Sequence, residues 1–401
     1  MRAHHAAILL MILAAACTSE KKQNSSQDDS LPSPDTFRTA DLLFLQSDQQ
    51  RLYFQNIPRI LPTNKIEKGQ RKHRLTEASK NLSDFTFSFK DTVRTLDQFV
   101  KQTNVVGLLI IRNDSILFEQ YREGITPSTT WISFSVAKSV TSLLYGAALK
   151  DGLIESLDQR VSQFVPELVG SAYDSVSLRH LLQMSSGVRW NDDTRDPDSD
   201  LMKVAKLEEQ EGWAGVVKYL AALKREAAPG QKFNYNTIES GLAAVILKKV
   251  VGKSLSEYLS DKIWKPFGMH EDASWVLSRS VNVENGGCCI SASLRDYALI
   301  GLFALNNGIT SEGKEILPAT WMQESITPAN SFNEYGYYWW LRPGSGRYFA
   351  SGAFGQQIEI DTASNTIIAV QSHWPIAFNN YYVGYIDTAI ESLLKTLNNK
   401  N

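Results

Sequence analysis

The sequence predicts an α/β fold in which an antiparallel sheet, built from both ends of the chain, is flanked by helices and carries an inserted, mainly helical lobe. Three observations predict it. Runs rich in β-forming residues lie near residues 105–122 and 358–370, helical patterns dominate residues 136–270, and an amphipathic pattern ends the chain. Strands at both ends with helices between them favour one sheet with an inserted lobe. The cleft between sheet and lobe is then the expected site of function.

Length and composition exclude several classes of protein. The 401 residues, 43% of them hydrophobic, can bury a large core, which excludes a disordered chain. The 41 basic and 43 acidic residues give a formal net charge of −2, which disfavours a nucleic-acid binder. Three cysteines are too few for a disulfide scaffold. No H-x-x-x-H or C-x-x-C pair is present, so a zinc enzyme is not expected.

The first residues are expected to be an export signal. Residues 6–16 are apolar and too short to span a bilayer, but they suit a signal peptide. The three alanines before Cys17 resemble a bacterial lipoprotein cleavage site, although Leu13 lies one position farther from the cysteine than usual. We therefore expect a signal peptide over 1–16 and lipidation of Cys17. An ordinary secretory signal is the alternative.

Either signal exports the protein. The polar residues 17–34 would form a flexible tether. Lipidation of Cys17 would anchor the protein to a membrane of the bacterial cell envelope, facing the periplasm or the exterior.

Two hairpins are predicted. Residues 105–122 contain two β-rich runs on either side of Asn113-Asp114, a sequence typical of a tight turn. Residues 358–360 and 366–370 flank a second polar turn near the C-terminus. These hairpins would supply the strands from the two ends of the chain.

Three helices have clear patterns. The first begins near Val136 and is stopped by Asp151-Gly152, and the second covers 242–251 and ends at Gly252. The third covers 382–397, where apolar residues recur at helical spacing.

A Ser-x-x-Lys pattern recurs in this sequence, so the pattern alone carries little information. Ser19 with Lys22 lies in the tether, and Ser311 with Lys314 lies in a polar turn. Ser135 with Lys138 differs from these pairs because it opens a long apolar helix.

Helix geometry makes Ser135 and Lys138 a possible nucleophile and base. Residues i and i+3 share a helix face, so Lys138 can reach the Ser135 hydroxyl. A serine hydroxyl needs an adjacent base to become nucleophilic, and the helix N-terminus stabilises developing negative charge. The alternative is that Ser135 only caps the helix and Lys138 is solvated.

The Ser135 window resembles the serine β-lactamase and penicillin-binding superfamily, in which S-x-x-K is a known signature. The sequence is most similar to its class C β-lactamase-like esterases and aminohexanoate-oligomer hydrolases. Further motifs of that group follow in family order within residues 95–375. They are D-G-L-I at 151–154, L-R-H-L-L-Q-M-S-S-G at 178–187, P-G-Q-K-F-N-Y-N-T at 229–237, G-G at 286–287 with S-L-R-D at 293–296, Y-G-Y-Y-W-W at 335–340 and S-G-A-F-G-Q at 351–356.

The resemblance implies a β-lactamase-like hydrolase domain over residues 95–401, with its helical lobe at about 150–270 and an N-terminal extension at 35–94. It implies hydrolysis of a small carboxylic ester or amide through an acyl-enzyme, without a metal or organic cofactor. Two alternatives stay open. One is a peptidase or β-lactamase that acts on cell-wall-type substrates, and the other is a penicillin-receptor-like sensor that is acylated without turnover.

The resemblance also implies roles for individual residues. Ser135 would be the nucleophile, Lys138 its partner, and Tyr235 a second general base that returns a proton to the leaving group. The backbone N–H groups of Ser135 and Ala353 would form the oxyanion hole. The substrate cleft would include Trp190, Thr237, Ser351, Gly352 and Gln356.

Two departures from the family pattern bear on chemistry. Thr237 stands where the family has Asn or Ser, and we expect its hydroxyl to form a hydrogen bond near Lys138. Ala350 stands where β-lactamases carry Lys or His, which predicts a preference for neutral substrates unless Arg342 or Arg347 approaches the cleft.

Three expectations concern packing. Cys288 and Cys289 are expected to be small buried hydrophobic residues, because neighbouring cysteines rarely bond to each other. His180 is expected to be a structural histidine. Trp339 and Trp340 are expected to pack in the core.

Overall fold

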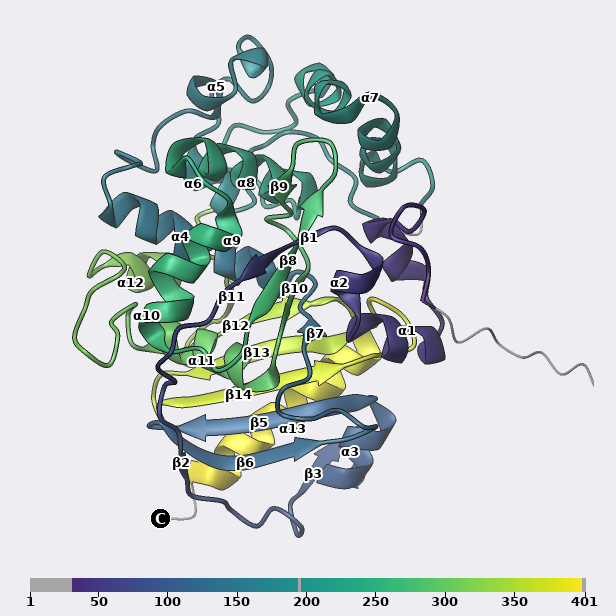
Figure 1. Cartoon of the computed structure of the whole chain (residues 1–401), viewed down its shortest axis with the longest axis vertical. Helices are drawn as coiled ribbons and strands as arrows, with labels where there is room; N and C mark the ends of the chain where they lie inside the picture. The colour runs from purple at the N-terminus through teal and green to yellow at the C-terminus, as the bar shows by residue number, and fades with distance from the viewer. Residues whose placement is uncertain (1–30, 194–195, 399–401) are drawn as a thin grey trace, which may run out of the picture. The chain divides into compact units, whose positions relative to one another are not determined.

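Strands from the two ends of the chain meet in one sheet, as the sequence predicts (Figure 1). The computed structural model describes residues 31–193 and 196–398, and the main sheet that they form has seven strands in the order β11-β12-β13-β14-β5-β6-β2. These are β11 (Trp340–Arg342), β12 (Arg347–Gly352), β13 (Gln356–Asp361), β14 (Thr366–Ser372), β5 (Val105–Arg112), β6 (Ser115–Tyr121) and β2 (Thr76–Glu77). The predicted signal peptide, Cys17 and the tether up to residue 30 lie outside the described residues.

Both predicted hairpins are confirmed. β5 pairs antiparallel with β6, and β13 pairs antiparallel with β14. β14 in turn pairs antiparallel with β5, which joins the two hairpins edge to edge. The sheet is antiparallel as predicted, except at one edge, where the short strand β2 pairs parallel with β6. The sequence could not predict β2, because a strand of two residues is too short to show a hydrophobic period.

A second sheet, which the sequence did not predict, positions the segment before Ser135. It consists of β1 (Thr63–Ile66), β8 (Ala273–Ser278), β10 (Ile290–Ala292) and β7 (Trp131–Ile132), with β9 (Val283–Glu284) paired to β8. Residues 35–94 thus contribute a strand to each sheet, and they also form the hairpin β3 (Thr86–Phe89) with β4 (Thr92–Thr95).

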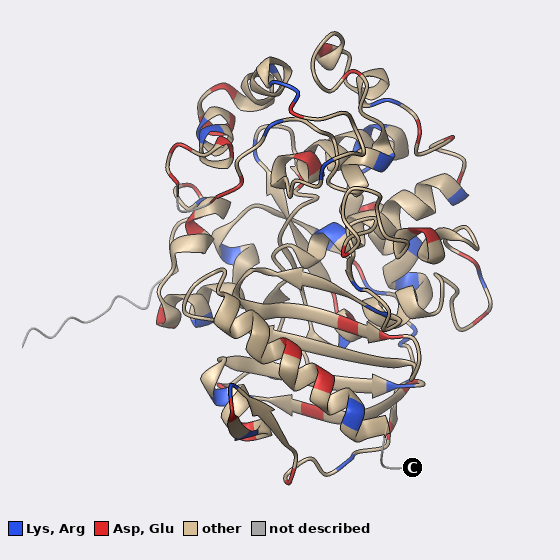
Figure 2. Ribbon diagram, turned by 180° about the vertical axis from the view of Figure 1, so that it is seen from behind, with Lys and Arg blue, Asp and Glu red and all other residues tan. Residues whose placement is uncertain are grey.

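Helices cover both faces of the main sheet. α11 (Leu294–Leu305) packs against β5, β13 and β14, and it does so closely, since a Cβ on Gly301 would meet Ile358 at 2.8 Å. The predicted C-terminal helix is α13 (Asn380–Asn398), which crosses the other face, beside α3 (Leu96–Gln102) (Figure 2). Its buried residues recur at helical spacing, as expected for one apolar face: Tyr385, Ile386, Ala389, Ile390, Leu393, Leu394 and Leu397.

The predicted lobe contains helices and no strand within the described part of residues 150–270. Its elements are α5 (Val161–Phe164), a 3₁₀ turn (Pro166–Leu168), α6 (Leu178–Leu182), α7 (Asp200–Ala222), α8 (Thr237–Val251), α9 (Leu255–Leu259), a π turn (Ser260–Trp264) and α10 (Lys265–Phe267). α8 ends at Gly252, which adopts the left-handed conformation with φ 71° that glycine allows at this position.

The remaining helical elements are a 3₁₀ turn (Thr39–Phe44), α1 (Ser47–Phe54), α2 (Ile57–Ile60), α4 (Val136–Lys150), α12 (Trp321–Ser325) and a 3₁₀ turn (Ala353–Gly355). Among the described residues, no helix combines the length and the apolar character needed to cross a bilayer.

Candidate active site

Ser135 lies at a sharp junction between strand β7 and helix α4. β7 ends at Ile132, and Phe134 has a φ of 45°, a conformation that non-glycine residues rarely adopt. The Ser133 side chain holds this turn by accepting a hydrogen bond from the Ile290 N–H at 2.9 Å. α4 then runs from Val136, confirming the predicted helix. Ser135 occupies the position before it, partly exposed, and its side chain caps no backbone N–H. The capping alternative is therefore wrong.

Lys138 is buried and directed at Ser135. Its side chain is 2% exposed, which excludes the solvated alternative. The side-chain nitrogen Nζ donates to Ser135 Oγ at 3.0 Å and to the Gly287 carbonyl at 2.8 Å. Nζ also lies 4.9 Å from the centre of the Tyr235 ring. The fold thus brings Ser135, Lys138 and Tyr235 together.

Tyr235 is held from the lobe side. The preceding residue Asn234 donates its N–H to Met184 O at 2.8 Å, and the following residue Asn236 caps α8 by accepting from the Glu239 N–H at 3.3 Å. The partly exposed Tyr235 ring stacks on Trp340, with centroids 6.0 Å apart and planes at 16°.

The two neighbouring tryptophans differ in their surroundings. Trp339 is fully buried, as expected for a packing residue. Trp340 is partly exposed and contacts Tyr235. Both tryptophans therefore pack against apolar neighbours as expected, Trp339 inside the core and Trp340 at its edge.

Strand β12 brings a backbone edge against Ser135. A Cβ on Gly352 would collide with the Ser133 carbonyl and lie 3.1 Å from Ser135 N, so only glycine fits there without a shift. β11 pairs only with residues 347–349 of β12, so residues 350–352 have no strand partner on that edge within the described chain. Ala353 follows directly. Within the described residues, neither the Ser135 N–H nor the Ala353 N–H donates a hydrogen bond to another backbone group.

The other residues predicted for the cleft have different positions. Ser351 is partly exposed on β12. Gln356 is 3% exposed and lies beneath the Ala353–Gly355 turn, where its amide donates to Ala353 O at 3.3 Å and Ser372 O at 2.7 Å. Gln356 thus supports the turn from inside rather than lining the cleft.

Thr237 and Trp190 share a partner that sequence analysis missed. Asp192 accepts hydrogen bonds from Trp190 Nε1 at 2.7 Å, from the Thr237 N–H at 3.0 Å and from the Thr237 hydroxyl at 2.8 Å. The Thr237 hydroxyl therefore donates a hydrogen bond near Lys138, as expected, and its acceptor is the Asp192 carboxyl, on which the charge of Lys138 acts. Trp190 is only 6% exposed, so most of its ring packs in the protein.

The Asp192 carboxyl interacts electrostatically with Lys138. Burial raises its pKa above the usual range, while the bonds from Trp190 and Thr237 and the charge of Lys138 act in the opposite direction. Asp192 lies in a polar stretch without periodicity, two residues after Trp190. Only the fold places it against the start of α8.

A second buried carboxyl, Glu239, lies in the first turn of α8. It accepts a hydrogen bond from the Tyr173 hydroxyl at 3.1 Å and is fully buried. Burial raises the pKa of Glu239 to about 8. The folded protein therefore keeps a proton on Glu239 at neutral pH that the unfolded chain releases.

Because Glu239 binds this proton on folding, we expect Glu239→Gln to raise the free energy of unfolding relative to wild type by an amount that grows with pH. Because the pKa rises on folding, from 4.5 to about 8, the wild-type free energy of unfolding falls as pH rises through this window. Gln does not titrate, and each pKa unit corresponds to about 1.4 kcal/mol. We expect the variant to gain several kcal/mol relative to wild type between pH 5.5 and 8.5, measured by urea unfolding at constant ionic strength. The exposed Glu167→Gln is the control, and a pH-independent difference for Glu239→Gln would contradict the assignment.

Two further expectations have opposite outcomes. Cys288 and Cys289 are bonded to each other in a disulfide, so the expectation of two separate apolar side chains is wrong. Adjacent residues can reach each other when the backbone between them permits it, and Cys289 has a φ of 78°. His180 is a structural residue as expected, because its Nδ1 lies 3.0 Å from Ser177 Oγ at the start of α6.

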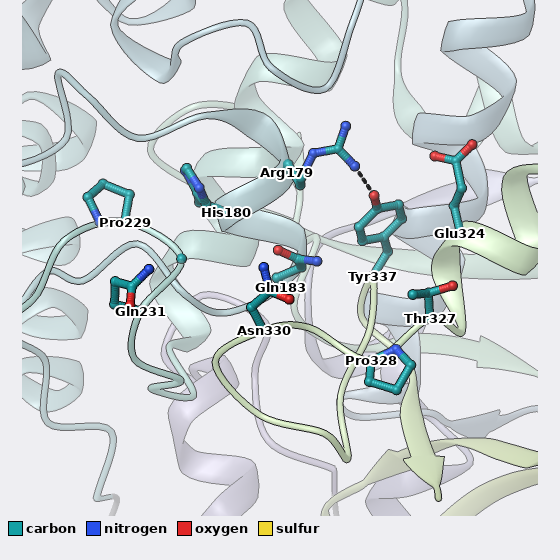
Figure 3. A pocket seen from close by; sticks show the side chains of 11 residues that line it. Arg179, His180, Gln183, Pro229, Gln231, Glu324, Thr327, Pro328, Asn330 and Tyr337 are labelled. Atoms are coloured by element: carbon teal, nitrogen blue, oxygen red, sulfur yellow. Dashed lines mark hydrogen bonds between the residues drawn. The ribbon is translucent and has the colours of Figure 1, made fainter. Parts of the chain in front are cut away.

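A separate cavity of about 450 Å³ lies between α6, the 229–231 loop and the 327–330 loop (Figure 3). Arg179 spans part of its wall and contacts the Tyr337 hydroxyl and Asp158. None of Ser135, Lys138 and Tyr235 lines this cavity. The cavity is therefore distinct from the place where these three side chains meet.

Comparisons with known proteins agree with the geometry. A family model described as Beta-lactamase matches residues 92–378. The 6-aminohexanoate-dimer hydrolase of Paenarthrobacter ureafaciens is 27% identical over 303 residues, which cover 70% of this chain and 75% of that protein.

Solved structures show the same fold. A Bacillus anthracis protein assigned as a 6-aminohexanoate-dimer hydrolase superposes with a TM-score of 0.74 at 22% identity, covering 88% of this chain and 95% of that one. EstCE1, a hydrolase with promiscuous acyltransferase activity, superposes with a TM-score of 0.57 at 14% identity, covering 73% of this chain and 95% of that one. The family match spans most of the chain, and the chain therefore belongs to the beta-lactamase family of hydrolases.

Proposed function

We propose that this protein hydrolyses a small carboxylic ester or amide through an acyl-enzyme on Ser135. The observation that carries the proposal is the 3.0 Å hydrogen bond between the buried Lys138 Nζ and Ser135 Oγ, beside the Tyr235 ring. Similar proteins support the substrate class, since they include a 6-aminohexanoate-dimer hydrolase and a hydrolase with promiscuous acyltransferase activity.

The proposed reaction has two stages. Ser135 Oγ attacks the substrate carbonyl carbon, and its proton passes to the basic pair Lys138 and Tyr235. The carbonyl oxygen gains negative charge, which the Ser135 and Ala353 N–H groups would stabilise. Tyr235 returns a proton to the leaving alcohol or amine. Water then attacks the acyl-enzyme with the same groups as bases, releasing the acid and restoring Ser135.

Intact-protein mass spectrometry with an activated ester tests this proposal. The enzyme hypothesis predicts a transient mass increase of one acyl group that decays as product forms. A stable adduct without turnover would instead identify the sensor alternative. No adduct and no turnover with esters, amides or β-lactams would overturn the proposal.

The strand that faces Ser135 predicts a preference for uncharged substrates. Ala350 is fully buried and offers neither charge nor hydrogen-bond donor. The two nearby arginines are engaged elsewhere: Arg342 bonds to Glu359 at 2.9 Å and to Asp387 at 2.5 Å, and Arg347 lies 4.0 Å from Glu359. A substrate carboxylate would therefore find no free cation on β12.

We expect 4-nitrophenyl acetate to be a better substrate than its hemisuccinate analogue or a penicillin. A charge-assisted hydrogen bond contributes about 1.5–3 kcal/mol, so a site without the cation forgoes about 10-fold to 100-fold in carboxylate binding. The measurement is kcat/KM for the matched acetate and hemisuccinate esters. Penicillin hydrolysis that is faster than acetate hydrolysis would favour the β-lactamase alternative.

We also propose that Cys17 is lipidated and holds the protein at a membrane of the bacterial cell envelope. Support comes from the sequence, where three alanines precede Cys17 and a polar tether follows it. Cys17→Ser is expected to move the protein from the membrane fraction to the soluble exported fraction. Immunoblotting of the two fractions measures this change. A wild-type protein found wholly in the soluble fraction would contradict lipidation.

A further inference from the structure

The segment that carries the two cysteines, Gly286–Cys289, is bonded to both ends of the Ser135–Lys138 pair. The Gly287 carbonyl accepts from Lys138 Nζ at 2.8 Å. The Cys289 N–H donates to the carbonyl of Phe134, the residue before Ser135, at 3.2 Å. The positions of both proposed catalytic side chains therefore depend on this segment.

The Gly286–Cys289 segment also fits tightly between helices α4 and α8. The Gly286 carbonyl accepts from the Thr141 hydroxyl on α4 at 2.9 Å. On the other side, a Cβ on either Gly286 or Gly287 would collide with Ser240 of α8. Because α8 leaves no room beside this segment and α4 is hydrogen-bonded to it, a shift of the cysteines would be passed to Gly287 and Lys138.

The two cysteines differ in access to solvent. Cys289 is fully buried, whereas Cys288 is partly exposed. The Cys289 backbone is held at φ 78°, a conformation that persists in a non-glycine residue only when its surroundings impose it. A thiolate from solution can therefore approach the Cys288 sulfur, and breaking the bond releases one constraint on the Cys289 backbone.

We propose that Cys288–Cys289 is a redox-modification site for low-molecular-weight thiols, and that its disulfide form holds the Ser135–Lys138 pair in its working geometry. This inference rests on the proposed function of that pair. In the reaction, a dithiol R(SH)₂ attacks the Cys288 sulfur and forms a mixed disulfide, and Cys289 leaves as a thiol. The second thiol of the reagent then displaces Cys288. Two electrons and two protons pass to the protein, and the reagent becomes a cyclic disulfide.

Reduction is expected to lower activity. Two thiol sulfurs cannot stay at bonding distance, so the side chains of Cys288 and Cys289 must separate. The tight packing then transmits the shift to the Gly287 carbonyl and to Phe134. A misplacement of about 1 Å in a catalytic group can cost 10²-fold, so we expect kcat to fall by about 10-fold to 100-fold.

The test uses the full chain with Cys17→Ser, in which Cys288 and Cys289 are the only cysteines. The protein is reduced with dithiothreitol, desalted and assayed with 4-nitrophenyl acetate, then re-oxidised with oxidised glutathione and assayed again. Iodoacetamide labelling followed by intact mass counts the free thiols in each state. The matched control carries Cys288→Ser and Cys289→Ser in the same background.

The expected result is two labelled thiols with low kcat after reduction, no labelled thiol with restored kcat after re-oxidation, and no response in the control. Equal kcat in both thiol states would overturn the redox inference and leave the proposed function intact. Two free thiols that persist under oxidation would also overturn it. Absent turnover in both states, matched by Ser135→Ala, would instead show that the proposed function itself is wrong.

Discussion

Ser135→Ala is expected to lower kcat for any accepted ester by at least about 10³-fold, the loss typical when a nucleophile is removed. The physical reason is that, within the described residues, Ser135 Oγ is the only hydroxyl to which Lys138 Nζ donates a hydrogen bond. Lys138→Ala is expected to be nearly as severe, because a nucleophile and its base act as a unit. Stopped assays with 4-nitrophenyl acetate measure both variants.

The chain offers a matched control for this experiment. Ser311 and Lys314 repeat the same Ser-x-x-Lys pattern in an exposed turn. Ser311→Ala should retain wild-type kcat, and circular dichroism should show the same fold in all variants. Wild-type turnover in a folded Ser135→Ala variant would be fatal to the proposed acyl-enzyme.

Tyr235→Phe is expected to lower kcat by about 10²-fold to 10⁴-fold, the range that general acid–base catalysis contributes. The substitution removes only the hydroxyl, so the ring should keep its stacking on Trp340 and its position beside Lys138. Substrate binding should therefore change little, and the loss should appear in kcat rather than KM.

Tyr381→Phe, at an exposed tyrosine on α13, controls for loss of a tyrosine hydroxyl elsewhere. A Tyr235→Phe variant with a raised KM and an unchanged kcat would show that Tyr235 binds substrate and moves no proton. Full activity of that variant would leave Lys138 as the sole base.

Local patterns in the sequence predicted the elements that carry the proposed chemistry. The C-terminal helix has strong periodicity because it buries one stripe of side chains. The helix after Ser135 and strands β5, β13 and β14 are buried on nearly all sides, so the sequence showed them as continuous apolar or β-forming runs. The order of motifs around Ser135, Lys138 and Tyr235 was enough to place the chain in its family. The i, i+3 spacing alone made contact between Lys138 and Ser135 possible.

The surroundings of these residues became clear from the fold. Strands β7 and β10 have two and three residues, too few to show a period, so their support of the Ser135 turn was invisible in the sequence. The contact of Asp192 with Thr237 joins residues 45 positions apart, and sequence comparison did not identify Asp192 as the acceptor for the Thr237 hydroxyl.

Three helices, the two hairpins, the Ser-x-x-Lys pair and the family could be predicted from the sequence, because these depend on residues that are close together in the chain. The burial of Lys138 against Gly287 emerged only with the fold, because it depends on packing between segments 149 residues apart, which no local pattern encodes. The support that Gln356 gives to its turn and the bond between Cys288 and Cys289 join residues close in the chain, but they depend on backbone conformations that the surrounding fold imposes.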